Sequence, residues 1–248
     1  MDETLADRLA AVRERVRRAC VDAGRSPDEV TLVLASKTQP VAAVRAALEA
    51  DARARARDES LRPVVLGENR VQELVAKAPE LVDLTPTWHV IGPLQSNKVN
   101  AALRFAACVQ SVESLDLARR LADRVADRAG ARERALDVMV QVNVSGEATK
   151  HGVAPELAPD LALDVAALPG LRLAGFMTVG ARSSDEAVVR SGYARLRALR
   201  DEVLGSGARG TAGAVGLSMG MSGDLEAAIA EGATMVRIGS AVFGDRRH

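Results

Sequence analysis

Apolar residues recur every three or four positions near the beginning of the chain and then give way to short apolar runs. The first stripe comprises Leu5, Leu9, Val12, Val16 and Cys20. This spacing predicts an amphipathic helix that ends near Gly24. Eight apolar segments follow and are predicted to be strands, at 30–36, 64–66, 88–91, 107–111, 136–142, 171–178, 214–217 and 234–238. Periodic segments between them predict helices, including 41–50, 114–129 and 185–204.

Strict alternation of strands and helices predicts a parallel sheet. Eight such units in about 220 residues suit a closed barrel, and an open doubly wound sheet is the alternative. Both folds place binding sites at the carboxyl ends of the strands. We therefore expect residues 1–248 to form a single α/β domain, a (β/α)8 TIM-type barrel with an extra N-terminal helix packed on it.

Composition narrows the class of partner. Hydrophobic residues make up 48% of the chain and charged residues 27%, which is typical of a soluble globular protein. Basic and acidic residues balance at 33 each and aromatic residues are only 2%, so the composition does not favour nucleic acid as a binding partner. No apolar run approaches the roughly 20 residues of a membrane span, and residues 1–4 do not resemble a targeting signal. We expect a cytoplasmic protein that binds a small ligand.

Several features have simple structural interpretations. Cys20 and Cys108 form no C-x-x-C pair, which predicts buried free thiols, and no metal-binding motif occurs. His89 ends a strand segment and is expected to be structural. The 50–63 segment, with alternating Ala and Arg, predicts a solvated helix extension or loop. The 205–210 segment matches G-x-G-x-x-G, but it follows a helix and predicts only a flexible loop.

The chain has only four lysines, and one of them stands apart. Lys77 and Lys98 lie in helical patterns, where a solvated amine is expected, and Lys150 lies in a polar loop. Lys37 instead ends an apolar strand and shares a face with its smaller side chains. We expect this face to point into the barrel, which delivers the amine to the end where barrel active sites are built.

A second cation is predicted beside the first. Partial desolvation at this end of the barrel favours the neutral form of the Lys37 amine, and a neutral amine can attack an aldehyde. The alternative is that Lys37 only caps its strand and pairs with Glu68. Arg237 faces the interior from the eighth strand, and barrel closure makes it a neighbour of Lys37. The segments 218–222 and 239–240 leave strands seven and eight, where barrels commonly bind phosphate. Together these features indicate an anionic ligand.

Some of these residues also fit simpler interpretations. Ser222 is suited to cap a helix that begins at Leu225. Asn69 and Gln72 match a capping box at the start of another helix. Tyr193, the only tyrosine, lies in a helical pattern and is expected to pack within the protein.

Five stretches, taken in order, resemble the YggS/PROSC family of pyridoxal phosphate homeostasis proteins. They are S-K-T-Q-P at 36–40, G-E-N at 67–69, W-H-V-I-G-P-L-Q-S-N-K at 88–98, L-S-M-G-M-S at 217–222 and M-V-R-I-G at 235–239. The resemblance implies a fold type III barrel like the N-terminal domain of alanine racemase. It also implies pyridoxal 5'-phosphate (PLP) held as a Schiff base on Lys37. The other implied cofactor-binding residues are Asn69 beside the ring, Arg237 facing the pyridine nitrogen, Ser218, Gly239 and Ser240 at the phosphate, and Met219 and Ser222 in the same loop.

Arginine opposite the pyridine nitrogen bears on the role of the protein. A guanidinium cannot accept a proton at ordinary pH, so the bound cofactor would be a weak electron sink. A racemase also needs a second base, and Tyr193 is the only tyrosine available. We therefore expect a monomeric PLP carrier without robust catalysis, which exchanges PLP with apo PLP-dependent enzymes. The alternatives are a PLP-dependent amino-acid racemase and a phosphate-binding barrel without PLP.

Overall fold

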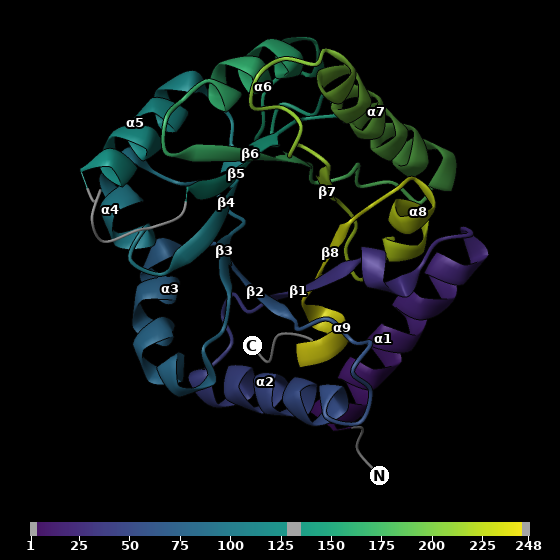
Figure 1. The fold of residues 1–248 in the computed structure, drawn as a ribbon. Coiled ribbons are helices and arrows are strands. Elements are labelled where there is room, and N and C mark those ends of the chain that lie inside the picture. Colours follow the sequence, from purple (N-terminus) through teal and green to yellow (C-terminus); the bar gives the residue numbers. More distant parts are fainter. Residues whose placement is uncertain (1–3, 128–134, 245–248) are drawn as a thin grey trace.

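A computed structural model describes residues 4–127 and 135–244, and in this part of the chain eight parallel strands close into a barrel (Figure 1). The strands are β1 Thr31–Ala35, β2 Val65–Glu68, β3 Trp88–Val90, β4 Ala106–Val112, β5 Leu136–Gln141, β6 Leu171–Met177, β7 Gly216–Ser218 and β8 Met235–Ile238. Their spatial order follows the chain, and β1 pairs with β8 to complete the ring. This closure confirms the predicted barrel and excludes the open doubly wound sheet.

Helices surround the barrel (Figure 1). They are α1 Leu5–Asp22, α2 Val41–Arg55, α3 Val71–Lys77, α4 Val99–Ala102, α5 Leu115–Ala126, α6 Ala158–Ala166, α7 Glu186–Gly205, α8 Leu225–Ala230 and α9 Ser240–Phe243. Short 3-10 turns lie at Pro27–Glu29, Ala78–Leu84, Ser96–Lys98 and Pro155–Leu157. The helix predicted at 114–129 is present up to Ala126, and residues 128 and 129 lie outside the described residues.

The N-terminal helix α1 fills a gap in the ring of helices. The helix after β8, α9, has only four residues and cannot cover the junction between β8 and β1. Instead α1 packs against α2, α8 and α9, and it buries Leu9, Val12 and Cys20. Thr4 and Asp7 fix its beginning through a capping box. The extra helix therefore packs on the barrel, as predicted.

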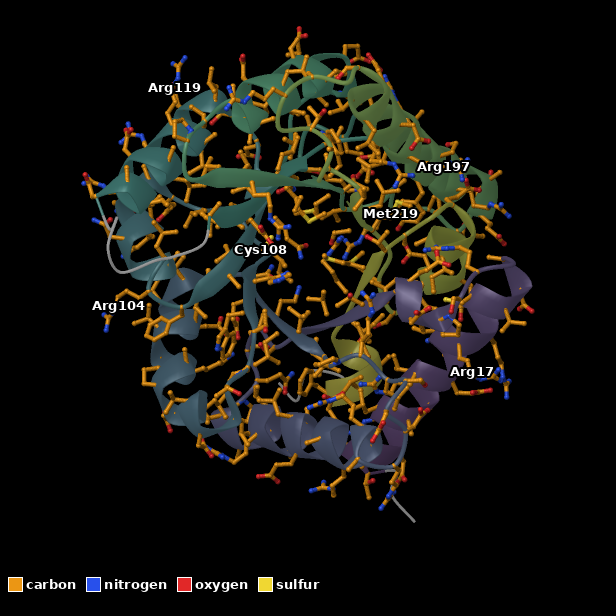
Figure 2. All side chains as sticks on the ribbon, in the orientation of Figure 1. Arg17, Arg104, Cys108, Arg119, Arg197 and Met219 are labelled. Atoms are coloured by element: carbon orange, nitrogen blue, oxygen red, sulfur yellow. The ribbon has the colours of Figure 1, made fainter. Side chains whose placement is uncertain are left out.

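Strand residues alternate between two layers. On β1, Leu32 and Leu34 belong to the apolar layer between strands and helices, whereas Val33 faces the interior and lies opposite Arg237 of β8. The interior layer includes Cys108, Met139 and Met177, which form a cluster separate from the main core. Figure 2 shows Cys108 inside the barrel and surface arginines such as Arg119 at its outer edge. The barrel therefore has a packed interior.

The segments that follow α2 and α7 and the two cysteines can now be compared with their predictions. Helix α2 extends to Arg55 and an irregular segment follows, as expected for 50–63, although Asp51 is buried and pairs with Arg13 and Arg55. Gly205 ends α7, and residues 206–210 form a loop with turns at 206 and at 209–210. Cys20 and Cys108 are buried free thiols, as predicted. Within the described ranges, every helix is too short or too polar to cross a membrane.

Candidate functional site

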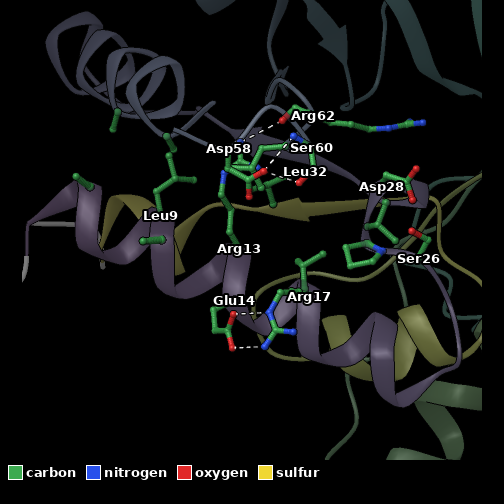
Figure 3. Close-up of a pocket in the computed structure, with 18 residues that line it drawn as sticks. Leu9, Arg13, Glu14, Arg17, Ser26, Asp28, Leu32, Asp58, Ser60 and Arg62 are labelled. Carbon is green, nitrogen blue, oxygen red and sulfur yellow. Dashed lines mark hydrogen bonds and ion pairs between the residues drawn. The ribbon is translucent and has the colours of Figure 1, made fainter. Parts of the chain in front are cut away.

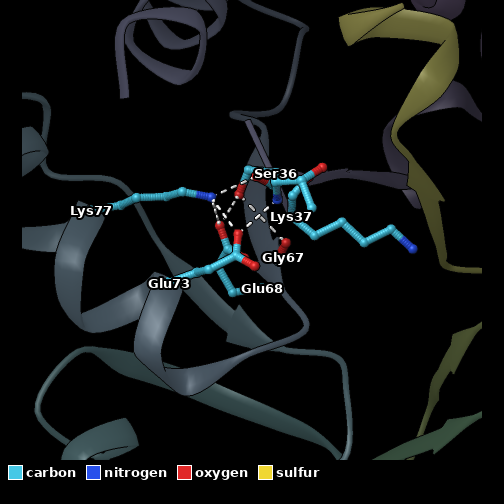
Figure 4. A network of polar contacts seen from close by, with 7 residues as sticks. Ser36, Lys37, Gly67, Glu68, Glu73 and Lys77 are labelled. Carbon is cyan, nitrogen blue, oxygen red and sulfur yellow. Dashed lines mark hydrogen bonds and ion pairs between the residues drawn. The ribbon is translucent and has the colours of Figure 1, made fainter. Parts of the chain in front are cut away.

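Lys37 lies in the turn directly after β1, at the carboxyl end of the barrel. Its side chain is half-buried, and among the described residues no group bonds to its amine. Figure 4 shows the side chain pointing away from Glu68. Glu68 is bound elsewhere, because its Oε1 accepts a 2.7 Å hydrogen bond from Lys77 Nζ. The alternative in which Lys37 pairs with Glu68 is therefore excluded.

The prediction for Lys77 was wrong, because its amine is buried and not solvated. Its side chain is only 8% exposed and pairs with Glu68 and Glu73. Val71, Leu74 and Lys77 recur every three residues along the buried face of α3, which brings the amine against the end of β1. Burial raises the pKa of Glu68, and the hydrogen bonds from Lys77 and Ser36 oppose this rise.

Arg237 lies inside the barrel at the end of a chain of polar side chains. Its Nη2 donates to the carbonyl of Thr178 (2.6 Å) and its Nη1 to Ser218 Oγ (2.9 Å). Ser218 donates in turn to Gln110 Oε1 (2.7 Å), and Gln110 Nε2 lies 2.8 Å from His89 Nδ1. Burial lowers the pKa of Arg237 to about 10, so the guanidinium remains a cation at neutral pH. The chain of hydrogen bonds holds this cation in one orientation.

His89 is buried and hydrogen-bonded, as expected of a structural histidine. The Gln110 amide donates to Nδ1, so this nitrogen carries no proton. Burial lowers the pKa of His89 to about 4, and the ring stays neutral at physiological pH. Sequence reasoning missed Gln110, although its spacing from Cys108 places a polar side chain on an interior face.

The loops after β7 and β8 meet where phosphate binding is predicted. Ser222 Oγ lies 3.4 Å from Ser240 Oγ and accepts a 3.4 Å hydrogen bond from the Ala241 amide. Gly239 joins β8 to the short helix α9, which contains Ser240 and Ala241. Ser222 does not cap α8, because Asp224 occupies the N-cap position. Two hydroxyl groups and a backbone amide therefore converge at this end of the barrel.

Ser218 and Met219 lie deeper than the other residues of their loop. The hydroxyl of Ser218 is fully buried and bound to Gln110 and Arg237. The Met219 amide donates to the Met235 carbonyl (3.1 Å), and its side chain is also buried. Both residues therefore support β8 and Arg237, while Ser222 and Ser240 present the more accessible hydroxyls.

Asn69 follows β2 and is half-buried. The capping-box interpretation is excluded, because Arg70 occupies the N-cap position of α3 and makes no side-chain cap. Gly92 packs tightly against this residue: a Cβ atom there would lie 2.4 Å from the Asn69 carbonyl oxygen. The glycine after β3 therefore allows the loop to fix the backbone of Asn69.

These groups come from strands that are adjacent in the closed barrel, in the order β7, β8, β1 and β2. They supply an amine on Lys37, an interior cation on Arg237 and hydroxyls on Ser222 and Ser240. A free amine suits an aldehyde, and hydroxyl groups with a backbone amide suit a phosphate. The set fits a phosphorylated aldehyde such as PLP. Among residues 4–127 and 135–244, no group of three or more potential ligands could hold a metal ion.

A cavity of about 620 Å³ lies elsewhere, between α1 and α2 near the amino end of β1 (Figure 3). Apolar side chains such as Leu9, Val30 and Leu32 line it. At its edge Arg17 is already paired with Glu14. None of the predicted cofactor-binding residues lines this cavity.

Comparisons with known proteins identify the family of this chain. Residues 8–247 match the family described as alanine racemase, N-terminal domain. A pyridoxal phosphate homeostasis protein from Pseudomonas aeruginosa is 44% identical over 98% of this chain and 96% of that protein. PipY of Synechococcus elongatus, solved with PLP bound, has a TM-score of 0.78 and 31% identity, over 97% of this chain and all of that chain.

A more distant structure shows the likeness of fold alone. The alanine racemase of Clostridium difficile 630 has a TM-score of 0.69 and 15% identity, over 95% of this chain but 57% of that chain. Full-length similarity is thus found with the homeostasis proteins, and the racemase extends beyond the matched part. The chain belongs to the family of pyridoxal phosphate homeostasis proteins, which share the N-terminal barrel of alanine racemase.

Proposed function

We propose that this protein binds PLP at the carboxyl end of its barrel, as a Schiff base on Lys37, and serves intracellular PLP homeostasis. The half-buried amine of Lys37, to which no described residue is bonded, is the observation that carries this proposal. Ser222, Gly239 and Ser240 hold the phosphate, and Asn69 lies beside the ring. Ser218 and Met219 contribute by supporting Arg237 and β8. The family membership and the PLP bound to PipY support the choice of ligand.

Arg237 supports a binding role without robust catalysis. Bound PLP can act as an electron sink, and this action is strongest when its ring nitrogen is protonated. The cationic guanidinium of Arg237 donates hydrogen bonds and cannot supply a carboxylate's negative charge at that nitrogen. The site therefore favours holding PLP over transforming amino acids.

Tyr193 also argues against the racemase alternative. The side chain is fully buried in α7, as predicted, and its hydroxyl donates to Asp224 Oδ2 (2.7 Å). Burial raises the pKa of Tyr193 above its usual value, which disfavours the phenolate that a base would need. We further propose that residues 1–248 act as one monomeric, cytoplasmic domain that exchanges PLP with apo-enzymes.

A PLP titration followed by visible absorbance tests the proposal. We expect the wild-type protein to develop the absorbance of a protonated Schiff base and Lys37→Ala to lose it. Lys98→Ala is the matched control, because it also removes one amine and should keep the signal. Equal signals from wild type and Lys37→Ala would exclude attachment at Lys37. Alanine or serine racemisation that disappears in Lys37→Ala would favour the enzyme instead.

A further inference from the structure

An ion-pair network, buried at Glu68 and Lys77 and partly exposed at Glu73, touches the backbone on both sides of Lys37 (Figure 4). On one side, Lys77 Nζ donates to the Ser36 carbonyl oxygen over 2.7 Å. On the other, the Thr38 amide donates to Glu73 Oε2 over 2.7 Å. These two bonds attach both neighbours of Lys37 to α3.

The same charged groups are tightly connected to one another. Lys77 Nζ also donates to Glu68 Oε1 (2.7 Å) and Glu73 Oε2 (3.0 Å), so all three of its hydrogen atoms have acceptors. Ser36 Oγ donates to the same oxygen of Glu68 over 2.8 Å. The amine of Lys77 is therefore held in one position, and it is not free to react as Lys37 is.

Three features of this network are energetically unfavourable, so stability alone does not explain it. The other Glu68 oxygen, Oε2, is buried and has no hydrogen-bond partner among the described residues. Buried ion pairs add little net stability compared with well-packed apolar side chains. Thr38 also has φ of +62°, a left-handed conformation that is rare for a β-branched residue. Such local strain persists only where surrounding contacts enforce it.

We infer that Glu68, Glu73 and Lys77 are positioning residues, which hold the 36–38 turn so that the Lys37 amine faces the ligand. This inference rests on the proposed attachment of PLP to Lys37. The network pulls the backbone of Ser36 and Thr38 towards α3, and the Lys37 side chain extends in the opposite direction (Figure 4). A displaced turn slows attachment, because reactions of held groups depend steeply on their placement.

Glu73 offers a matched pair of variants, because its side chain is 23% exposed and α3 should tolerate substitution there. Glu73→Ala removes the acceptor of the Thr38 amide, whereas Glu73→Gln keeps an oxygen that can accept the same bond. Gln72→Ala changes an exposed neighbour on α3 outside the network and controls for helix effects.

The first measurement is amide hydrogen exchange of the PLP-free protein. We expect exchange at Thr38 to rise on the order of tenfold in Glu73→Ala and to stay near the wild-type rate in Glu73→Gln and Gln72→Ala. Unchanged exchange in Glu73→Ala would overturn the inference. This readout does not depend on PLP binding, so it remains informative even if the proposed function fails.

The second measurement compares covalent attachment with reversible binding. Attachment of PLP should slow on the order of tenfold in Glu73→Ala and much less in Glu73→Gln. Affinity for pyridoxine 5'-phosphate, which lacks the aldehyde, should stay close to wild type in both. Wild-type protein that never attaches PLP would refute the proposed function. Attachment by Glu73→Ala at the wild-type rate, or an equal loss of pyridoxine 5'-phosphate affinity, would refute the positioning role alone.

Discussion

The orientation of Arg237 depends on one hydroxyl group. Ser218 Oγ accepts from Arg237 and donates to Gln110, and all three side chains are buried. Removing this hydroxyl leaves a buried donor and a buried acceptor without their partner, which costs about 1–3 kcal/mol.

We therefore expect Ser218→Ala to lower the free energy of unfolding by about 1–3 kcal/mol in urea denaturation. Ser191→Ala, at an exposed position of α7, should change it by less than about 0.5 kcal/mol. A Ser218→Ala protein as stable as the control would show that this hydrogen-bond chain contributes little.

His89 should make the protein sensitive to mild acid. Its pKa is about 4 in the folded protein and 6.5 as the ordinary value, so below pH 6.5 the unfolded chain binds a proton that the folded chain does not. The contribution of His89 to stability falls as the pH drops from 6.5 to 4, by about 1.4 kcal/mol per pH unit, and does not change further below pH 4.

His89→Gln replaces the titratable ring with an amide that binds no proton in this pH range, and the amide oxygen can still accept the hydrogen bond from the Gln110 amide. We expect the difference in unfolding free energy between wild type and variant to be constant above pH 7. Between pH 6.5 and 4 it should shift by about 3 kcal/mol in favour of the variant. Urea denaturation at several pH values measures this difference, and a flat difference would contradict a buried neutral His89.

The partners of Lys77 and Ser218 could not be predicted from the sequence, and the physical reason is the same for both. Lys77 and Ser218 each bind partners from other elements: Glu68 ends β2, and Gln110 lies on β4. Local spacing identifies which face of an element a residue occupies, but it does not identify the group on the facing element. Lys37 was easier to recognise, because an amine at the end of an apolar strand is unusual by itself.

The N-terminal helix α1 contributes to the stability of the barrel from outside the ring of strands. It covers the junction between β8 and β1 and buries Leu9, which is 2% exposed. We expect Leu9→Ala to lower the free energy of unfolding by about 2 kcal/mol, near the lower end for such changes because Leu9 already borders a cavity. Val21→Ala, at an exposed position of the same helix, should change it by less than about 0.5 kcal/mol. Equal effects in urea denaturation would show that α1 is not integral to the barrel.

The loop after β3 packs so closely against Asn69 that position 92 has no room for a side chain. A side chain at Gly92 would place Cβ 2.4 Å from the Asn69 carbonyl oxygen, so Gly92→Ala must displace one of the two loops. We expect this variant to be less stable by about 1–3 kcal/mol and to bind PLP more weakly. Gly205→Ala is the control, because nothing lies within 4 Å of its added Cβ. Wild-type PLP affinity in Gly92→Ala would contradict a role for Asn69 beside the ring.

Most elements were predictable because strand and helix periods differ clearly along this chain. The seventh strand was among the least well placed: it was predicted at 214–217 and is observed at Gly216–Ser218. Ala214 is held in a turn by a hydrogen bond to the Thr211 carbonyl, and the strand begins only after it. A buried alanine in a turn resembles a buried strand residue in sequence, so periodicity could not separate them.

At the scale of the whole molecule, barrel closure creates the candidate site. Lys37 and Arg237 are 200 positions apart in sequence, but β1 and β8 are paired neighbours. The register places Arg237 opposite Val33, so the two cations leave adjacent strands at different depths. Barrel closure predicted that their strands would be neighbours, but this difference in depth depends on the register.

Borohydride reduction of the PLP-saturated protein, followed by peptide mass analysis, tests the central claim most directly. Reduction converts a Schiff base into a stable secondary amine, so the modified lysine keeps a phosphopyridoxyl group through digestion. We predict this group on the peptide that contains Lys37 and not on those that contain Lys77, Lys98 or Lys150. An unmodified Lys37 peptide, or modification spread evenly over the four lysines, would contradict the account.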